Sequence, residues 1–143
     1  MEMLKWNNEK MSVGIKLIDA QHQELLKIIN QLTTSIEENS QKKDILIIID
    51  ELIKFAGYHF LTEEKLFDEF NYEETEVHKN EHKEFSTKFI KMRNKLLEDE
   101  LYKSKSAVII AEEVFNYIIN WFIHHVTGSD KKYVKLFKEY GIE

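Results

Sequence analysis

Apolar residues recur at helical spacing in four long stretches of this sequence, and none of its 143 residues is proline. Side chains three and four positions apart share one face of an α-helix, and an internal proline would break such a helix. The stretches run from Ile15 to Ile36, from Ile45 to Leu66, from His78 to Leu96 and from Ala111 to His125. The sequence therefore predicts four helices, each with one apolar face.

The breaks between these helices are short and polar, and they comprise residues 38–40, 71–75 and 99–106. Short connections make successive helices antiparallel neighbours. We therefore expect an all-α fold, an up-down-up-down antiparallel four-helix bundle with an N-terminal arm. Ser40 is expected to cap the second helix, Gly128 to end the fourth in a left-handed conformation, and residues 129–140 to form a short C-terminal helix. The sequence shows no linker, so residues 1–143 are expected to form a single domain.

The composition excludes several classes of function. Hydrophobic residues make up 43% of the chain and charged residues 32%, which indicates a folded, soluble protein. The chain contains no cysteine, so iron–sulfur clusters and thiolate zinc sites are excluded. The net charge of -6 argues against nucleic acid as a partner. The most apolar stretch, residues 107–126, contains two glutamates and two asparagines, so we expect no membrane association and a cytoplasmic location.

Six histidine and glutamate residues occupy positions on the apolar faces, where the core of the bundle should lie. They are His22, His59, Glu63, His78, His82 and His125. An unpaired buried polar group costs roughly 1–3 kcal/mol, and a buried charge costs more. Six of them together would threaten a fold with a net stability of about 5–15 kcal/mol. A common partner must therefore satisfy them.

The spacing of these residues favours a metal as that partner. His59 and Glu63 are four residues apart, as are His78 and His82, so each pair projects from one face of its helix. In an antiparallel bundle, all five histidines then fall toward the same end. A single histidine on an apolar face is usually an ordinary hydrogen-bonded core residue, but five in register on four helices favour a metal site. His124 is expected to point about 100° away from its neighbour and to bind no metal, and Glu64 is expected to face solvent.

Several motifs follow one another in a fixed order. They are Trp6, Val13-Gly14-Ile15, Ile18-Asp19-x-Gln21-His22, His59-Phe60-x-x-Glu63-Glu64, His78-x-x-x-His82 and Trp121-x-x-x-His125-x-x-x-x-Asp130. With these motifs the sequence resembles the bacterial hemerythrins over nearly its whole length. The resemblance implies two iron ions joined by an oxo or hydroxo bridge. It adds Asp130 to the metal ligands, and it favours His125 over His124.

The resemblance also implies a division of roles among the ligands. His78, His82 and His125 would bind one iron, His22 and His59 would bind the other, and Glu63 and Asp130 would bridge both through their two oxygens. Molecular oxygen would bind reversibly and end-on, as a hydroperoxide, at the open iron held by His22 and His59. The expected role is oxygen storage, delivery or sensing, and not catalysis.

Residues that neighbour the ligands are expected to line and support the metal site. Leu25, Phe60 and Phe122 lie beside ligands in the sequence and are expected to line the oxygen pocket, although the same residues suit plain core packing. Partners for the second nitrogen of the ligand histidines are sought among Asp19, Gln21 and Glu81, which the sequence alone does not assign.

Two other functions compete with oxygen binding. One alternative is a di-iron oxidase, peroxidase or iron-handling enzyme, although such sites are usually richer in glutamate. Another is a dinuclear zinc hydrolase.

Overall fold

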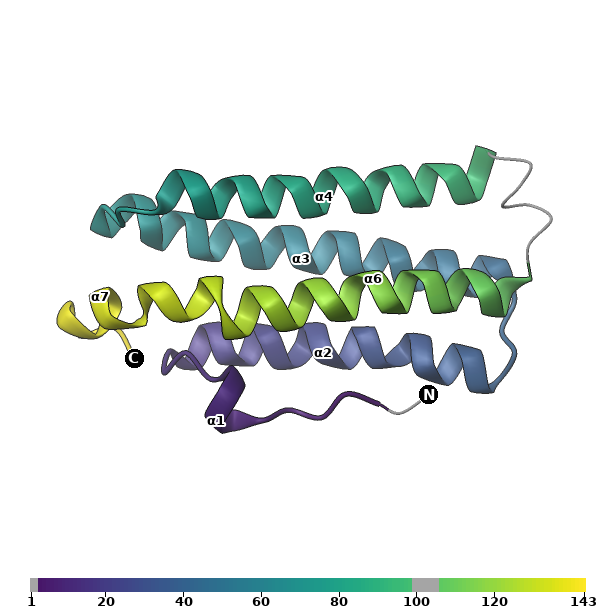
Figure 1. The fold of residues 1–143 in the computed structure, drawn as a ribbon, viewed down its shortest axis with the longest axis horizontal. Helices are drawn as coiled ribbons and strands as arrows, with labels where there is room; N and C mark the ends of the chain where they lie inside the picture. The colour runs from purple at the N-terminus through teal and green to yellow at the C-terminus, as the bar shows by residue number, and fades with distance from the viewer. Residues whose placement is uncertain (1–2, 99–105) are drawn as a thin grey trace.

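The computed structural model describes residues 3–98 and 106–143, and in these ranges the chain forms a bundle of four long helices (Figure 1). They are α2 (Lys16–Glu37), α3 (Lys42–Phe70), α4 (Thr75–Glu98) and α6 (Ala107–Thr127). The short helix α1 (Asn8–Met11) lies in the N-terminal arm, and the 3-10 helix η1 (Ser129–Tyr133) and helix α7 (Val134–Glu139) follow α6. The described residues contain no strand. The predicted all-α antiparallel bundle is confirmed.

The N-terminal end of α3 differs from the prediction. Helix α3 begins after Gln41, and the backbone N–H of Gln41 donates to the side chain of Asp44 at 3.3 Å. The prediction that Ser40 caps this helix was therefore wrong, because the capping residue is Gln41, which pairs with Asp44 in the first turn. At the other end, Asn71 adopts a left-handed conformation with φ 53°. The break predicted at 99–106 lies outside the described residues except at Ser106, which caps α6.

Gly128 ends α6, but not in the predicted left-handed conformation. Its φ is -111° and its ψ is -84°. A Cβ at this position would lie 2.6 Å from the carbonyl oxygen of His124, closer than non-bonded atoms tolerate. Glycine is needed here for close backbone approach and not for a positive φ. The tight turn leads directly into η1, so the predicted helix over 129–140 is divided into η1 and α7.

The apolar core consists of two clusters. The larger one fills the length of the bundle between the four long helices. The smaller one closes the end of the bundle near α7 and is formed by Val13, Ile15, Ile18, Phe67, Tyr133 and Phe137. Burying each large apolar side chain contributes about 1.5–3 kcal/mol. No helix in the described ranges is both long enough and apolar enough to span a membrane.

Candidate metal centre

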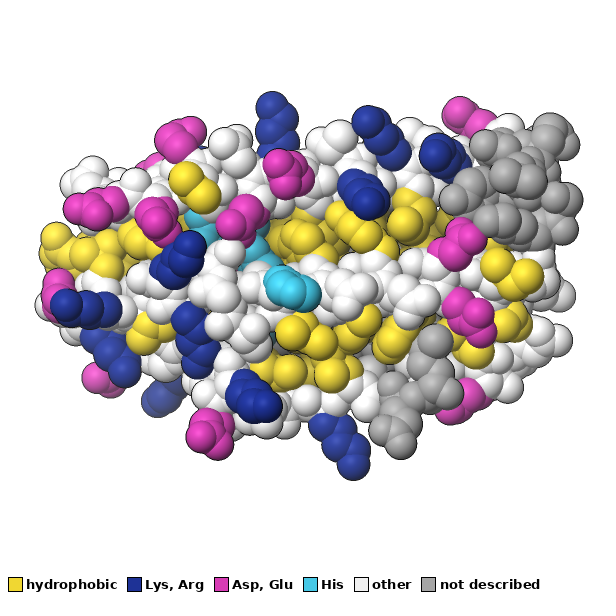
Figure 2. All heavy atoms as spheres, in the orientation of Figure 1, with side chains coloured by type: hydrophobic (Ala, Val, Ile, Leu, Met, Phe, Trp, Pro, Cys, Tyr) yellow, Lys and Arg dark blue, Asp and Glu magenta, His cyan; other side chains and the backbone are white. Residues whose placement is uncertain are grey.

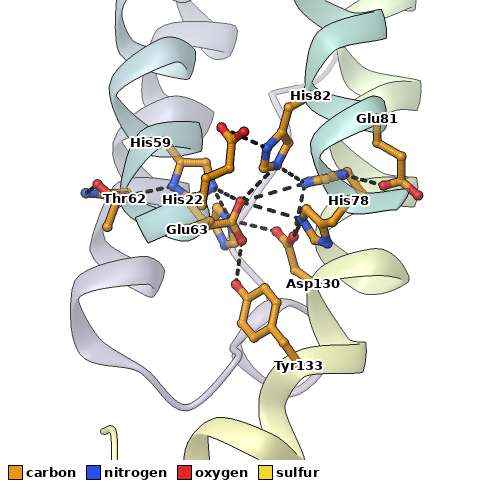
Figure 3. A network of polar contacts seen from close by, with 12 residues as sticks. His22, His59, Thr62, Glu63, His78, Glu81, His82, Asp130 and Tyr133 are labelled. Carbon is orange, nitrogen blue, oxygen red and sulfur yellow. Dashed lines mark hydrogen bonds and ion pairs between the residues drawn. The ribbon is translucent and has the colours of Figure 1, made fainter. Parts of the chain in front are cut away.

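A layer of polar side chains lies inside the bundle near its α7 end, and it contains every metal ligand proposed from the sequence (Figure 3). Helix α2 contributes His22, α3 contributes His59 and Glu63, α4 contributes His78 and His82, α6 contributes His125, and η1 contributes Asp130. None of these residues is more than 4% exposed.

Local structure explains how these residues meet. His59 and Glu63 lie one helical turn apart on α3, and His78 and His82 do so on α4, so each pair faces inward together. Asp130 reaches the layer by another route, because the turn at Gly128 redirects the chain after α6. No helical periodicity relates Asp130 to the other ligands, since it lies beyond the end of α6.

The first group of potential ligands consists of His22, His59, Glu63 and Asp130, whose donor atoms all lie within 4.8 Å of one another. The Nε2 atoms of His22 and His59 are 3.0 Å apart. The Nε2 atom of His59 lies 3.1 Å from Oε1 of Glu63, and that of His22 lies 3.0 Å from Oδ2 of Asp130. Two nitrogens and two carboxylates thus surround one small volume.

The second group consists of Glu63, His78, His82 and His125. The Nε2 atoms of His82 and His125 are 3.2 Å apart, and Oε1 of Glu63 lies 3.2 Å from Nε2 of His82. Oδ1 of Asp130 lies 2.9 Å from Nε2 of His78 and 3.0 Å from that of His125. Glu63 therefore belongs to both groups, and Asp130 directs one oxygen toward each of them.

The two carboxylates are oriented differently. Asp130 extends its two oxygens to the two groups, as the expected bridging role requires. Glu63 presents only Oε1 to both groups, because its Oε2 accepts a hydrogen bond of 2.6 Å from the hydroxyl of Tyr133. Sequence reasoning did not identify Tyr133. Tyr133 could have been found from its position three residues after Asp130, because one turn of a 3-10 helix places both side chains on the same face.

Several buried polar atoms in this layer lack a hydrogen-bond partner among the described residues. They are Oε1 of Glu63, both carboxylate oxygens of Asp130, Nε2 of His78, Nδ1 of His22 and Nδ1 of His82. Most of these face the shared centre of the two groups. Imidazole nitrogens and carboxylate oxygens together suit divalent transition metals such as iron. The donor set and its unsatisfied atoms therefore fit a pair of metal ions.

The pKa values show how strongly these groups depend on one another. Burial by itself would raise the pKa of Glu63, but the surrounding imidazoles, His59 above all, hold it well below its ordinary value. Burial would lower the pKa of His78, but the neighbouring carboxylates of Asp130 and Glu63 favour its charged form and raise it to about 9. For His82 burial prevails and lowers the pKa to about 4. Without metal, the positive charge of protonated imidazoles balances the negative charge of the two buried carboxylates.

Side chains around the site fix the orientation of the ligand histidines. Nδ1 of His59 lies 2.7 Å from Oε1 of Gln21, and Nδ1 of His125 lies 3.1 Å from the carboxylate of Glu81. Gln21 in turn donates to the hydroxyl of Thr62 at 3.1 Å. Asp19, the third candidate, does not approach a ligand but accepts from the backbone N–H of Val13 at 2.8 Å.

Two neighbours of the ligands were assigned from the sequence to the surface. His124 is exposed as expected, and its Nδ1 lies 2.7 Å from the carbonyl oxygen of Asn120. Glu64 faces solvent only in part: its side chain is 24% exposed, and its Oε2 lies 3.6 Å from Nδ1 of His82. The difference from the expectation arises because α3 and α4 pack closely enough for this carboxylate to reach behind the ligand.

Aromatic rings cover the site on several sides. Leu25, Phe60 and Phe122 are all buried, as expected. The ring of Phe122 meets that of His22 edge-on at 6.3 Å. Phe60 stacks on His82 at 4.0 Å and is 6.0 Å from His59, so it mainly covers the second group. Trp121 stacks on His125 at 4.4 Å with an interplanar angle of 15°.

Comparison with known proteins shows a consistent similarity. A family model described as Hemerythrin HHE cation binding domain matches residues 13–137. The chain is 26% identical to a bacteriohemerythrin of Stenotrophomonas maltophilia over 133 residues, which cover 93% of this chain and 80% of the relative. It is also 26% identical to a bacteriohemerythrin of Clostridium acetobutylicum, covering 92% and 99% of the two chains. The crystal structure of a wild-type hemerythrin superposes with a TM-score of 0.82 at 19% identity, covering 94% of this chain and 98% of that one.

Proposed function

Because this chain belongs to the hemerythrin family, we propose that it binds molecular oxygen reversibly at a centre of two iron ions. The observation that carries this proposal is the division of seven buried donors into two adjoining groups that share Glu63. A single metal ion would leave several of these donors unsatisfied, whereas two ions close together use all of them. The fold of solved hemerythrins supports the same assignment.

We assign the ligands from the two groups. His78, His82 and His125 would hold one ion, and His22 and His59 would hold the other. Asp130 would bridge the ions, since one of its oxygens lies near each group. Glu63 would be the second bridge, because it is common to both groups.

The two ions would differ in the number of protein ligands, and this difference supports the choice of oxygen site. When bound, iron would supply the reversible binding of oxygen, and we assign oxygen to the ion that His22 and His59 would hold, because fewer protein donors surround it. His22 and His59 are each 1% exposed, so this side of the centre is screened from water. Phe122 contacts His22 edge-on, and Leu25 lies one turn along α2. Water exclusion favours release of intact oxygen over irreversible oxidation.

Hydrogen bonds around the centre keep the ligand atoms facing inward. Gln21 accepts from Nδ1 of His59, and because the Gln21 amide donates to Thr62, its oxygen is the end that faces the imidazole. A neutral His59 that donates from Nδ1 has its lone pair on Nε2, the atom that faces the other donors and could bind a metal. Glu81 holds His125 in the same tautomer. The bond to His125 and burial act in opposite directions on Glu81, and the net effect lowers its pKa to about 2, so it stays ionised as an acceptor.

Tyr133 acts on the shared carboxylate from the other side. Burial raises the pKa of Tyr133 well above its ordinary value, so the hydroxyl remains protonated and can donate to Glu63. This bond holds Glu63 in one orientation with Oε1 directed at both groups of histidines.

The direct test is repeated exposure to oxygen. The protein is reconstituted with ferrous iron without air, then oxygen is admitted and removed in cycles while the visible spectrum and iron content are recorded. We expect about two irons per chain and a colour that appears and fades reversibly. Permanent colour after one exposure, with release of an oxidised product, would instead indicate a di-iron oxidase. Native protein that is colourless and contains zinc would refute the assignment of iron.

Adjacent histidines on α6 provide a matched pair of variants for this test. His125→Ala removes a proposed ligand, whereas His124→Ala removes an exposed side chain of the same type. We expect the first variant to lose iron and the oxygen spectrum, and the second to retain both. Equal behaviour of the two variants would contradict the assignment of His125.

A further inference from the structure

The bundle has an open seam between α4 and α6. Helix α2 packs against both α3 and α6, and α3 packs against α4. The backbones of α4 and α6 approach each other less closely, and side chains such as Phe85 and Trp121 make the contacts between them. A groove of about 940 Å³ occupies this seam. Such a volume lies within the usual range of ligand and cofactor pockets, roughly 300–1,000 Å³. Figure 2 shows a hydrophobic strip between the two helices, with histidine at one end of it.

The floor of this groove is aromatic and lies directly behind the metal centre. Phe85, Tyr117 and Trp121 line it together with Met92. The rings of Phe85 and Trp121 are 4.3 Å apart, and Trp121 stacks on His125. A flat ring resting on Trp121 would therefore be separated from a proposed metal ligand by one stacked side chain.

The rim of the groove is basic, although the whole chain carries a net charge of -6. Of the residues that the structure describes, the lining includes Lys83, Lys88, Lys91 and Lys95, and Glu84 is its only acidic member. Within residues 3–98 and 106–143, no ion pair joins any of these four lysines to a carboxylate. Nζ of Lys88 lies instead over the ring of Tyr117, 4.7 Å from its centre. Unpaired cations above an aromatic floor suit a planar ring that carries an anionic group.

We propose that this groove binds reduced flavin mononucleotide, which returns the oxidised metal centre to its oxygen-binding state; this proposal rests on the proposed di-iron function. The flavin ring would lie on Trp121 and Phe85. Its phosphate would be held by Lys91 and Lys95, which are four residues apart on one face of α4. Lys91 lies six residues beyond Phe85, about 9 Å along the helix, which suits the length of the ribityl chain between the ring and the phosphate.

The electron balance favours a flavin over a nicotinamide. A reduced flavin releases two electrons and two protons and leaves as oxidised flavin. Two ferric ions take one electron each, and the protons pass to solvent. Because each ion accepts a single electron, the donor must release its electrons one at a time, which flavins do, whereas nicotinamides transfer a hydride. The stacked pair of Trp121 and His125 would provide the route for them.

Binding is tested first, independently of iron. Oxidised flavin mononucleotide, riboflavin, inorganic phosphate and NADPH are titrated into the full-length protein with and without metal. The chain has two tryptophans, so Trp6→Phe leaves Trp121 as the sole tryptophan reporter. We expect flavin mononucleotide to quench Trp121 fluorescence and to bind more tightly than riboflavin, which lacks the phosphate. Tighter binding of NADPH, or equal binding of free phosphate, would overturn the assignment of flavin.

Two double variants with the same change of charge locate the site. Lys91→Gln with Lys95→Gln should weaken binding of flavin mononucleotide roughly fivefold, as expected for loss of two exposed ionic contacts, and leave riboflavin unaffected. Lys54→Gln with Lys65→Gln removes two exposed lysines of α3 and should change neither affinity. Equal weakening in both pairs, or no binding at all, would overturn the proposal.

A kinetic measurement separates this proposal from the proposed function. Reduced flavin should restore the ferrous state more slowly in the variant of Lys91 and Lys95, while its oxygen cycle remains that of the unmodified protein. Flavin binding without an oxygen cycle would refute the proposed function but leave the groove as a flavin site. A normal oxygen cycle with equal rates of reduction in both double variants would refute the groove alone.

Discussion

Replacement of Tyr133 by phenylalanine isolates one hydrogen bond to the shared carboxylate. The hydroxyl of Tyr133 donates to Oε2 of Glu63 at 2.6 Å, and both side chains are fully buried. The ring contacts would remain, since Phe67 and Phe137 lie 5.3 and 5.0 Å from the Tyr133 ring and require no hydroxyl. The change therefore removes a polar contact and leaves no large cavity.

The expected cost follows from the charge of the acceptor. Glu63 stays ionised because its pKa lies well below its ordinary value, and a hydrogen bond to a charged group contributes about 1.5–3 kcal/mol. For a chain of this size, 1 kcal/mol corresponds to about 2–4 °C in Tm. Tyr133→Phe should therefore lower the Tm of the metal-free protein by about 3–12 °C, measured by circular dichroism.

A second tyrosine provides the control. The hydroxyl of Tyr72 lies 3.5 Å from Glu74 in an exposed contact. Tyr72→Phe should change the stability by less than about 0.5 kcal/mol, as is usual for a surface substitution. If both variants have the same Tm, or if Tyr133→Phe unfolds like the unmodified protein, the hydroxyl does not anchor Glu63 and our reasoning about this contact is wrong.

Four further predictions concern the ligands and the side chains that orient them. The pKa of His78 is raised to about 9 and that of His125 is raised well above its ordinary value, so both are protonated at neutral pH without metal. Metal binding requires neutral imidazoles, so it should release about two protons, measured by calorimetry in buffers of different ionisation enthalpy; release of none would contradict these pKa shifts. For the same reason the apparent metal affinity should rise with pH from neutral to about 9, where His78 loses its proton; an affinity independent of pH would exclude this competition. His82→Ala should lower iron content and the Tm of the iron-loaded protein, whereas unchanged iron stoichiometry would remove His82 from the ligand set. Gln21→Leu should retain iron but weaken its binding about 10–100-fold, as is usual when an outer partner of a ligand is lost, and unchanged affinity would show that His59 needs no such partner.

The sequence predicted the parts of this protein that depend on periodicity. Ligands such as His59 and Glu63 lie on the apolar face of a helix, and the same spacing that predicts the helix also predicts the direction of their side chains. The register of the four helices followed from short connections, so the meeting of ligands from different helices was predictable as well. The placement of Asp130 was not, because it depends on a turn at Gly128 whose geometry differs from the one expected.

The contacts that sequence reasoning did not assign are those in which a side chain of one helix reaches behind a ligand on the next helix. Glu64 approaches His82, and Glu81 approaches His125, although each acidic residue neighbours a different ligand in the sequence. Periodicity specifies which way a side chain leaves its own helix, but not which atoms of the adjacent helix it meets. The rotation and separation of packed helices decide that, and these depend on the sizes of the core side chains along the whole interface. The same limit applies to the seam between α4 and α6: the spacing of the lysines on α4 does not indicate a groove, and their position opposite Tyr117 and Trp121 makes them its rim.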